Sequence, residues 1–368
     1  MKAAVLTSVD TPLEVRDDVE IAEPQAGEVR IKIVASGVCH SDLSVQNGTI
    51  PLPTPIVLGP EGAGVVDAVG DGVTRVSEGD HVVLSFVPNC RECYFCTRGQ
   101  GFLCEKSAMQ AAGGLRDGTT RLSSGGAPLF QMAMCGTFGQ YAVVPEISTV
   151  KIPDDVPLES AALIGCSVLT GVGAALNTAE VRQGDTAVVI GAGGVGLNVI
   201  QGCRIAGADK IIAVDMFDSK LAMAKDFGAT DTVNAGAGDP VSNVMELTGQ
   251  RGADVSFEVI GLGATMEQAI GMIRPGGQAI LVGVPRMDVF LNLHAGFTFL
   301  YTAKSIKGCW YGSSNVNEDV PKLVELYQKG ELKLDELISR EIGVDDINEA
   351  FEAMEKGEVA RSVIQHSH

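Results

Sequence analysis

The stretch TAVVIGAGGVGLNVIQGCRIAG, residues 186–207, decides the fold of one half of this chain. The run from Thr186 to Ile190 suits a buried strand, a glycine-rich turn follows, and a helix-like run comes next. In such a turn, glycines permit a tight bend, close approach of a pyrophosphate and close packing of the helix. We therefore predict that Gly191, Gly193 and Gly196 form a dinucleotide-binding turn.

An acidic residue in the next strand supports this prediction. The run KIIAVD ends at Asp215, 24 residues after Gly191, where a carboxylate can accept a hydrogen bond from a ribose 2′-hydroxyl. The same carboxylate would repel the 2′-phosphate of NADP, so we expect NAD as the cofactor. A glycine-rich turn that holds no ligand is the alternative interpretation.

The pattern around this turn predicts two kinds of domain. After the turn, strands alternate with helices (KIIAVD and SKLAMAKDFGA, ADVSFEVI and TMEQAIGMI, then QAILVGV), which is typical of a parallel, doubly wound sheet. Before about residue 150, short β-like runs separated by Gly, Pro and Asp indicate a mostly β, barrel-like unit. The stretch after about residue 310 is expected to return to that first unit.

Composition excludes several functions. The chain has 368 residues, enough for about two domains. Its 27 Lys+Arg against 46 Asp+Glu give a net charge of −19, which disfavours nucleic acid and anionic membranes as partners. The longest apolar stretch, 187–200, is shorter than a membrane-spanning helix needs and is broken by glycines. A cytoplasmic protein is expected.

Four of the nine cysteines stand close together, as Cys90, Cys93, Cys96 and Cys104. Four thiolates at this spacing can close tetrahedrally on one zinc ion and leave no open position, so the pattern indicates a structural zinc site. An iron–sulfur cluster is less favoured, because its bacterial pattern has a shorter last gap and a proline after the last cysteine, whereas Glu105 follows here. Unligated thiols are the third interpretation.

A further pattern is divided among three places. These are Cys39-His40-Ser41-Asp42, Gly59-Pro60-Glu61 and Gly165-Cys166-Ser167. Each is weak by itself, since an isolated cysteine is more often a buried small apolar residue than a ligand. Their joint arrangement is informative.

The order of seven blocks, GVCHSD, LGPEGAG, the four-cysteine motif, GTFGQYAVVPEISTVKI, GCSVLTG, GAGGVG and AVDMFDSK, resembles the zinc-containing medium-chain dehydrogenase/reductase family, in its liver-type zinc alcohol dehydrogenase branch. The resemblance covers essentially the whole chain. It implies a GroES-like β-barrel catalytic domain at 1–166 with a structural zinc lobe at 88–106, a Rossmann NAD-binding domain at 167–309, and a return to the catalytic domain at 310–368.

The resemblance also implies roles for single residues. Cys90, Cys93, Cys96 and Cys104 would hold a structural zinc, Cys39 and Cys166 a catalytic zinc, and Ser41 would hydrogen-bond the substrate alcohol with Asp42 behind the zinc ligands. Thr170 and Val195 would border the nicotinamide, Asp215 and Lys220 the adenosine ribose, and His40 and Arg361 the pyrophosphate. Ile50 and Phe86 fall at substrate-pocket positions. The loop at about 105–135 is similar to that of the usually dimeric branch, so a homodimer is expected.

The chain departs from the family pattern at two positions. Where the family has Gly-His-Glu, with the histidine as third ligand of the catalytic zinc, this chain has Gly59-Pro60-Glu61, and proline cannot ligate a metal. Glu61 then either ligates the zinc or only orders the site. The second departure is Ser44, which stands where some relatives end their proton relay on a histidine.

These features together predict an NAD-dependent alcohol dehydrogenase. It would oxidise a hydrophobic primary, allylic or benzylic alcohol to an aldehyde or ketone, and catalyse the reverse, with zinc as Lewis acid. A thiol-adduct substrate is less expected, because the stretch EKSAMQAA after Cys104 lacks the arginine of glutathione-dependent relatives. The alternatives are a reductase of the same fold without catalytic zinc, acting on a carbonyl or activated C=C bond, and an NAD-binding protein without turnover.

Overall fold

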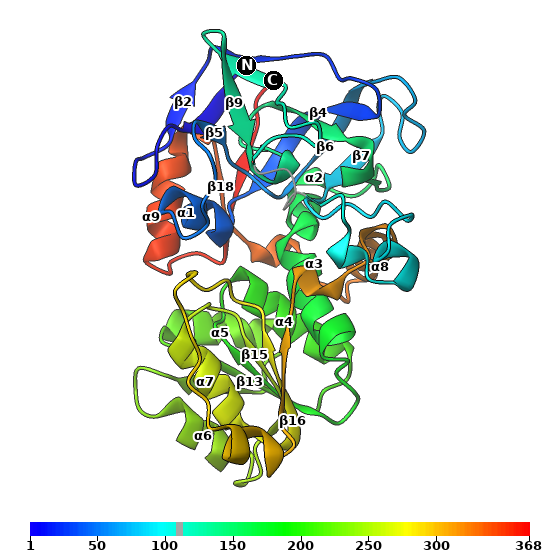
Figure 1. Ribbon diagram of the computed structural model, residues 1–368. Coiled ribbons are helices and arrows are strands. Elements are labelled where there is room, and N and C mark those ends of the chain that lie inside the picture. The colour runs from blue at the N-terminus through cyan, green and yellow to red at the C-terminus, as the bar shows by residue number, and fades with distance from the viewer. Residues whose placement is uncertain (108–112) are drawn as a thin grey trace. The chain divides into compact units, whose positions relative to one another are not determined.

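The computed structural model describes residues 1–107 and 113–368 (Figure 1). Residues 108–112, which belong to the 105–135 loop and to the EKSAMQAA stretch, lie outside this description. The chain divides into two compact units: one consists of Met1–Ser167 with Asn315–His368, and the other is Val168–Ser314.

A six-stranded parallel sheet forms the centre of the second unit. Its strands run in the order β14-β13-β12-β15-β16-β17. The order reverses at β12, which pairs with β13 on one side and with β15 on the other. This is the doubly wound arrangement predicted from the alternating pattern. The bounds are β12 Thr186–Ile190, β13 Lys210–Asp215, β14 Asp231–Asn234, β15 Ala253–Glu258, β16 Ile273–Leu281 and β17 Ser305–Gly308.

Helices pack against this sheet in two pairs, α4 with α5 and α6 with α7 (Figure 1). Apolar side chains of α6 and α7 meet buried β-branched residues such as Val188, Ile212 and Val214, and every residue of β12 is buried. Such continuous burial is expected for strands covered on both faces. The bounds are α3 Ser167–Gly173, α4 Gly194–Ile205, α5 Asp218–Phe227, α6 Pro240–Leu247 and α7 Gly263–Met272, with shorter turns at Ala174–Thr178, Gly296–Leu300 and Tyr311–Ser313.

Two β-sheets build the first unit, as the sequence predicts for a barrel-like domain. One has the order β11-β7-β6-β4-β19-β18 with β10 also paired to β4, and the other has the order β2-β1-β5-β9-β8-β3. The first sheet comprises β4 Glu28–Gly37, β6 Gly62–Val69, β7 His81–Leu84, β10 Tyr141–Pro145, β11 Thr149–Lys151, β18 Ile338–Ile342 and β19 Arg361–Gln365. The second comprises β1 Ala3–Leu6, β2 Glu14–Arg16, β3 Val19–Ile21, β5 Ile56–Val57, β8 Leu122–Ser124 and β9 Ala127–Gln131.

The C-terminal segment completes the first unit. Strand β19 pairs antiparallel with β4, with Val363 opposite Gly37. This pairing places the last strand beside residues near the beginning of the chain. The helices of this unit are α1 His40–Gln46, α2 Leu158–Ala162, α8 Val316–Gln328 and α9 Ile347–Glu355, with short 3-10 turns that include Cys96–Arg98, Gly101–Leu103 and Leu163–Gly165.

Within the described ranges, no single helix is long and apolar enough to cross a membrane, and only one bent pair, Leu158–Gly165 with Ser167–Thr178, meets the length and composition requirement jointly.

Two glycines of the β12–α4 turn differ in what surrounds them, and this difference is testable. A Cβ at Gly196 would lie 1.8 Å from the carbonyl oxygen of Gly191, whereas a Cβ at Gly193 would meet no atom within 4 Å. Overpacking of this kind costs about 1–3 kcal/mol, so we expect Gly196→Ala to lower Tm by about 3 °C or more and Gly193→Ala to leave it nearly unchanged. Thermal unfolding of the cofactor-free variants checks this, and equal Tm values for the two would contradict it.

Candidate functional site

The four-cysteine motif folds into a compact lobe. Two short 3-10 turns, Cys96–Arg98 and Gly101–Leu103, precede Cys104, and the four sulfur atoms all lie within 4.8 Å of one another. The Sγ atoms of Cys90 and Cys96 are 3.9 Å apart. Zinc–sulfur bonds of about 2.3 Å place tetrahedral sulfurs about 3.8 Å apart, so the spacing fits one zinc ion.

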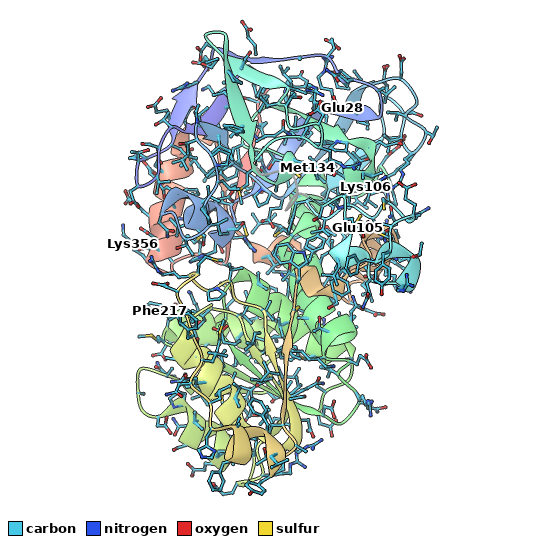
Figure 2. The ribbon with its side chains drawn as sticks, in the orientation of Figure 1. Glu28, Glu105, Lys106, Met134, Phe217 and Lys356 are labelled. Carbon is cyan, nitrogen blue, oxygen red and sulfur yellow. The ribbon has the colours of Figure 1, made fainter. Side chains whose placement is uncertain are left out.

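Backbone amides support the thiolate form of this lobe. The amide of Cys96 donates to Cys93 Sγ at 3.5 Å, and the amide of Lys106 donates to Cys104 Sγ at 3.4 Å. The Lys106 side chain, labelled in Figure 2, forms an ion pair with Glu92 of the same lobe. Because thiolates are the form that binds zinc, these donors favour metal binding.

A second cluster brings together Cys39, Glu61 and Cys166. One potential ligand atom from each lies within 4.8 Å of the other two, and all three side chains are buried. Cys39 precedes α1, Glu61 precedes β6, and Cys166 directly precedes α3. The structure therefore brings together the three places where the divided pattern was found.

Asp42 fixes the loops that carry this cluster. Its fully buried carboxylate accepts from the amide of Cys39 with one oxygen and from the amide of Gly59 with the other, both at 2.9 Å. Pro60 follows Gly59 and is buried. It offers no donor atom to a metal. Among residues 1–107 and 113–368, no histidine joins either group of clustered ligand atoms.

One oxygen of the Glu61 carboxylate accepts a hydrogen bond, and the other has no hydrogen bond among the described residues but forms an ion pair with Arg361. Oε2 accepts from the amide of Ser167 at 3.1 Å. Oε1 is buried and has no hydrogen-bond partner in the described chain, with Arg361 Nη1 3.4 Å away. A Cβ on Gly37 would lie 2.1 Å from Oε1, so only glycine at 37 leaves room for this carboxylate. Burial raises the pKa of Glu61 to about 7.

The two cysteines of this cluster differ in how readily they lose a proton. A hydrogen bond from Cys166 lowers the pKa of Cys39 well below its usual range, and the same bond raises the pKa of Cys166. The buried guanidinium of Arg361 also favours the thiolate of Cys39. Deprotonation is therefore easier at Cys39 than at Cys166.

Arg361 lies in this cluster. Its side chain donates to the carbonyl of Val38 at 3.0 Å and is 4% exposed, and its Nε has no partner in the described chain. The sequence resemblance suggested Arg361 only as a pyrophosphate neighbour, and no signal in the sequence links it to Glu61. The pairing of β19 with β4 explains this contact.

Some of the other predicted site residues of the first unit lie in α1, and the others lie further along the chain. Ser41 Oγ is buried without a partner in the described chain, and Ser44 Oγ lies 3.5 Å from Nδ1 of the exposed His40. Ile50 packs partly buried against the core cluster that contains Leu43, whereas Phe86 packs against the cluster of β4, β6 and β7.

In the second unit, the predicted cofactor residues gather at one edge of the parallel sheet. Gly191 has φ +98°, which favours glycine, and its amide donates to Val214 at 2.8 Å. Asp215 accepts from the amide of Ala192 at 2.8 Å and from that of Phe217 at 3.1 Å. The carboxylate therefore holds the glycine turn and closes the edge where dinucleotides bind in such sheets.

Three further predicted residues lie in helices of this part of the chain: Thr170 in α3, Val195 in α4 and Lys220 in α5. Lys220 lies 5.1 Å from the ring of Phe217, which is labelled in Figure 2 and 45% exposed. Val195 is in the first turn of α4, and Thr170 is in α3, which packs so closely on α4 that a Cβ at Gly171 would lie 2.5 Å from Val195 O.

Sequence reasoning missed Glu258, which ends β15 beside β12. It is fully buried, and its Oε1 accepts from the amides of Ile260 and Gly261 and from Thr265 Oγ1. The available signal was an acidic residue at the end of the apolar run ADVSFEVI.

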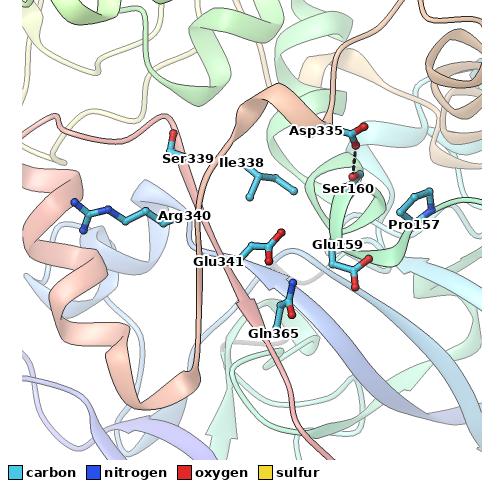
Figure 3. A pocket seen from close by; sticks show the side chains of 9 residues that line it. All are labelled: Pro157, Glu159, Ser160, Asp335, Ile338, Ser339, Arg340, Glu341 and Gln365. Carbon is cyan, nitrogen blue, oxygen red and sulfur yellow. Dashed lines mark hydrogen bonds between the residues drawn. The ribbon is translucent and has the colours of Figure 1, made fainter.

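A separate hollow of about 650 Å³ lies on the first unit (Figure 3). Acidic residues Glu159, Asp335 and Glu341 line it, and Ser160 donates to Asp335. None of the predicted site residues lines this hollow, so it is distinct from both cysteine clusters.

Comparisons with known proteins agree with this geometry. Residues 25–154 match the family model of the alcohol dehydrogenase GroES-like domain, and residues 194–329 match that of the zinc-binding dehydrogenases. The chain is 44% identical to alcohol dehydrogenase class-3 of Drosophila melanogaster, with 99% of this chain and 97% of the relative covered. It is 41% identical to the NDMA-dependent alcohol dehydrogenase of Amycolatopsis methanolica, with 100% and 99% covered.

The solved structures include a similar enzyme. The benzyl alcohol dehydrogenase of Acinetobacter calcoaceticus superposes with a TM-score of 0.93 at 33% identity, covering 100% of this chain and 99% of that one. The sequence-based expectation of a GroES-like domain combined with a Rossmann domain is confirmed. The chain belongs to the zinc-containing alcohol dehydrogenases of the medium-chain dehydrogenase/reductase family.

Proposed function

We propose that this alcohol dehydrogenase uses NAD to oxidise a hydrophobic primary, allylic or benzylic alcohol to an aldehyde or ketone, and catalyses the reverse reaction. The observation that carries the proposal is the buried pair Cys39 and Cys166 with the unpartnered Ser41 Oγ, in a chain that also has the Asp215 dinucleotide turn. Cys39, Cys166 and Ser41 suit the binding of an alcohol oxygen, and the turn held by Asp215 suits the binding of NAD.

Two zinc ions fit the donor sets of the chain. Cys90, Cys93, Cys96 and Cys104 would hold a structural ion, and Cys39 and Cys166 would hold a catalytic one. When bound, the catalytic ion supplies Lewis acidity that lowers the pKa of a substrate hydroxyl.

Residues of this chain would accept the proton of the substrate and pass it towards solvent. Ser41 Oγ would accept the proton of the substrate hydroxyl, since this oxygen is buried and otherwise unpartnered. Ser44 and His40 lie 3.5 Å apart and offer a route onward to solvent. Bound NAD would supply the acceptor for the hydride of the alcohol carbon, so each turnover would yield a carbonyl product, NADH and one proton.

The hydrophobic substrate class is supported by two observations. Ile50 and Phe86 are apolar at the predicted pocket positions, and the benzyl alcohol dehydrogenase of Acinetobacter calcoaceticus has a similar fold throughout. Incubation with NAD and a panel of primary, allylic and benzylic alcohols tests the proposal through the absorbance of NADH. Benzylic and allylic alcohols should be oxidised fastest, and an absence of turnover with every alcohol would contradict it.

Pro60 favours one competing function, a reductase of the same fold that works without catalytic zinc. Such an enzyme would reduce a carbonyl or an activated C=C bond with Ser41 as hydrogen-bond donor. Chelation separates the two proposals, because removal of the second zinc should abolish alcohol oxidation but leave a zinc-independent reductase active.

The charge of Asp215 generates a prediction on cofactor choice. We expect NAD to be preferred over NADP. Asp215→Ser should lower the ratio of kcat/KM with NAD to kcat/KM with NADP about tenfold, because it removes one charge-assisted hydrogen bond and the repulsion of the 2′-phosphate. Asp218→Ser, at a neighbouring acid that bonds Asn234, is the control and should leave the ratio unchanged. Equal kcat/KM with NADP in the unmodified enzyme would refute the assignment.

The four-cysteine lobe generates a prediction on stability. Because closed four-cysteine sites contribute directly to folding free energy, Cys93→Ser should lose one zinc per chain and lower Tm by several degrees, with little change in the affinity for NADH. Zinc analysis, thermal unfolding and NADH fluorescence measure these quantities. A variant with unchanged zinc content and unchanged Tm would contradict a structural zinc there.

The second unit exposes apolar side chains that support a homodimer. Met287, Phe290, Phe297, Leu300 and Tyr301 are each at least 70% exposed within one segment. An apolar patch of this kind is typical of an interface between copies.

We also propose a cytoplasmic location, which is supported by nine cysteines that form no disulfide in the described structure.

The double variant Phe290→Glu with Leu300→Glu tests the dimer. It should give a particle near the 38.3 kDa of one chain in light scattering, whereas the unmodified protein should give about twice that mass. Val9→Glu, at an exposed apolar side chain of the first unit, is the matched control and should remain dimeric. An unmodified protein that is monomeric, or a double variant that stays dimeric, would place the interface elsewhere or exclude it.

A further inference from the structure

We propose that Glu61 is the third protein ligand of the catalytic metal, and that Arg361 offsets the negative charge that this ligand adds. The proposal deepens the proposed function, since it concerns the donor set of the same zinc site. It starts from Pro60, which stands at the position of a ligating histidine and has no atom that can bind a metal.

The position of the Glu61 carboxylate carries the first step. One of its oxygens lies within 4.8 Å of both Cys39 and Cys166 Sγ, which is the separation expected of atoms that share one ion. The amide of Ser167 occupies Oε2, so Oε1, which within the described ranges has no hydrogen bond and only an ion pair with Arg361, is the oxygen available to a metal. A fully buried carboxylate oxygen without a hydrogen bond is costly, and a metal ion would satisfy it.

The surroundings hold this oxygen in place. The backbone carbonyl of Glu61 accepts from Ser36 Oγ and from Thr137 Oγ1, both at 3.0 Å. Gly37 leaves the space that Oε1 occupies, because a Cβ there would lie 2.1 Å away. Both the backbone and the side chain of Glu61 are thus fixed before a metal binds, which lowers the entropic cost of ligation.

Charge explains the presence of Arg361. Two thiolates and a neutral histidine would leave a divalent zinc site neutral, whereas two thiolates and Glu61 leave one negative charge in a buried place. Arg361 Nη1 lies 3.4 Å from Glu61 Oε1, and the guanidinium is 4% exposed. Its positive charge restores neutrality to the site as a whole. The formal charges of zinc, the two cysteine thiolates, Glu61 and Arg361 then sum to zero.

Metal content tests the proposal without reference to turnover. The unmodified protein should retain about two zinc ions per chain after dialysis. Glu61→Gln keeps an acceptor for the Ser167 amide but loses the anionic ligand. Because loss of even an outer-sphere partner weakens metal sites about 10- to 100-fold, we expect this variant to lose the second zinc to a mild chelator and keep the one in the four-cysteine lobe.

Two further variants separate ligation from a structural role. Glu258→Gln changes another fully buried glutamate, in the second unit, and should keep both zinc ions. Pro60→His with Glu61→Gln should regain the second zinc, because a histidine restores the third ligand. Cobalt substitution gives an independent readout: the absorption of the Cys39–Cys166 site should be lost in Glu61→Gln and return, with a shifted band, in the double variant.

The outcomes distinguish this inference from the proposed function. A Glu61→Gln variant that retains two zinc ions and an unchanged cobalt spectrum would overturn the ligand assignment, while alcohol oxidation by the same protein would leave the function intact. Loss of the second zinc that Pro60→His does not restore would also overturn it, because Glu61 would then act only by ordering the loops. Loss of the second zinc in Glu61→Gln and its return in the double variant, in a protein that oxidises no alcohol, would support the ligand set and refute the function.

Discussion

The antiparallel pairing of β4 with β6 is the constraint on which the buried cysteine cluster depends. Ser36 lies opposite Gly62 at the end of this pairing, and the amide of Gly37 donates to the carbonyl of Glu61 at 3.2 Å. The chain leaves β4 directly into Cys39 and enters β6 directly from Glu61. Strand β19 lies on the other side of β4 and brings in Arg361. One strand thus assembles three of the charged or metal-binding groups, although they are far apart in the sequence.

The sequence predicts those features whose cause is local. Strand, glycine turn and helix at 186–207 follow from short-range patterns, and the structure has them as β12 and α4. The four cysteines of the lobe lie within fifteen residues, so their spacing alone predicts that they can meet. The joint arrangement of Cys39, Glu61 and Cys166 could be predicted only through the family resemblance, since no local pattern connects residues separated by more than one hundred positions.

Other features depend on long-range pairing and could not be predicted in this way. Arg361 was expected only beside a pyrophosphate, and its contact with Glu61 arises because β19 pairs with β4. Glu258 was missed because its function as an acceptor for three donors depends on how the chain turns after β15.

Anomalous diffraction at the zinc absorption edge, from crystals of the protein purified with its metals, would locate each zinc ion and identify Glu61 as a ligand or exclude it. We expect one peak among the sulfur atoms of Cys90, Cys93, Cys96 and Cys104, and a second peak bonded to Cys39, Cys166 and one carboxylate oxygen of Glu61. A second peak that lies beyond bonding distance of Glu61, or a fully occupied zinc held by another side chain, would contradict it.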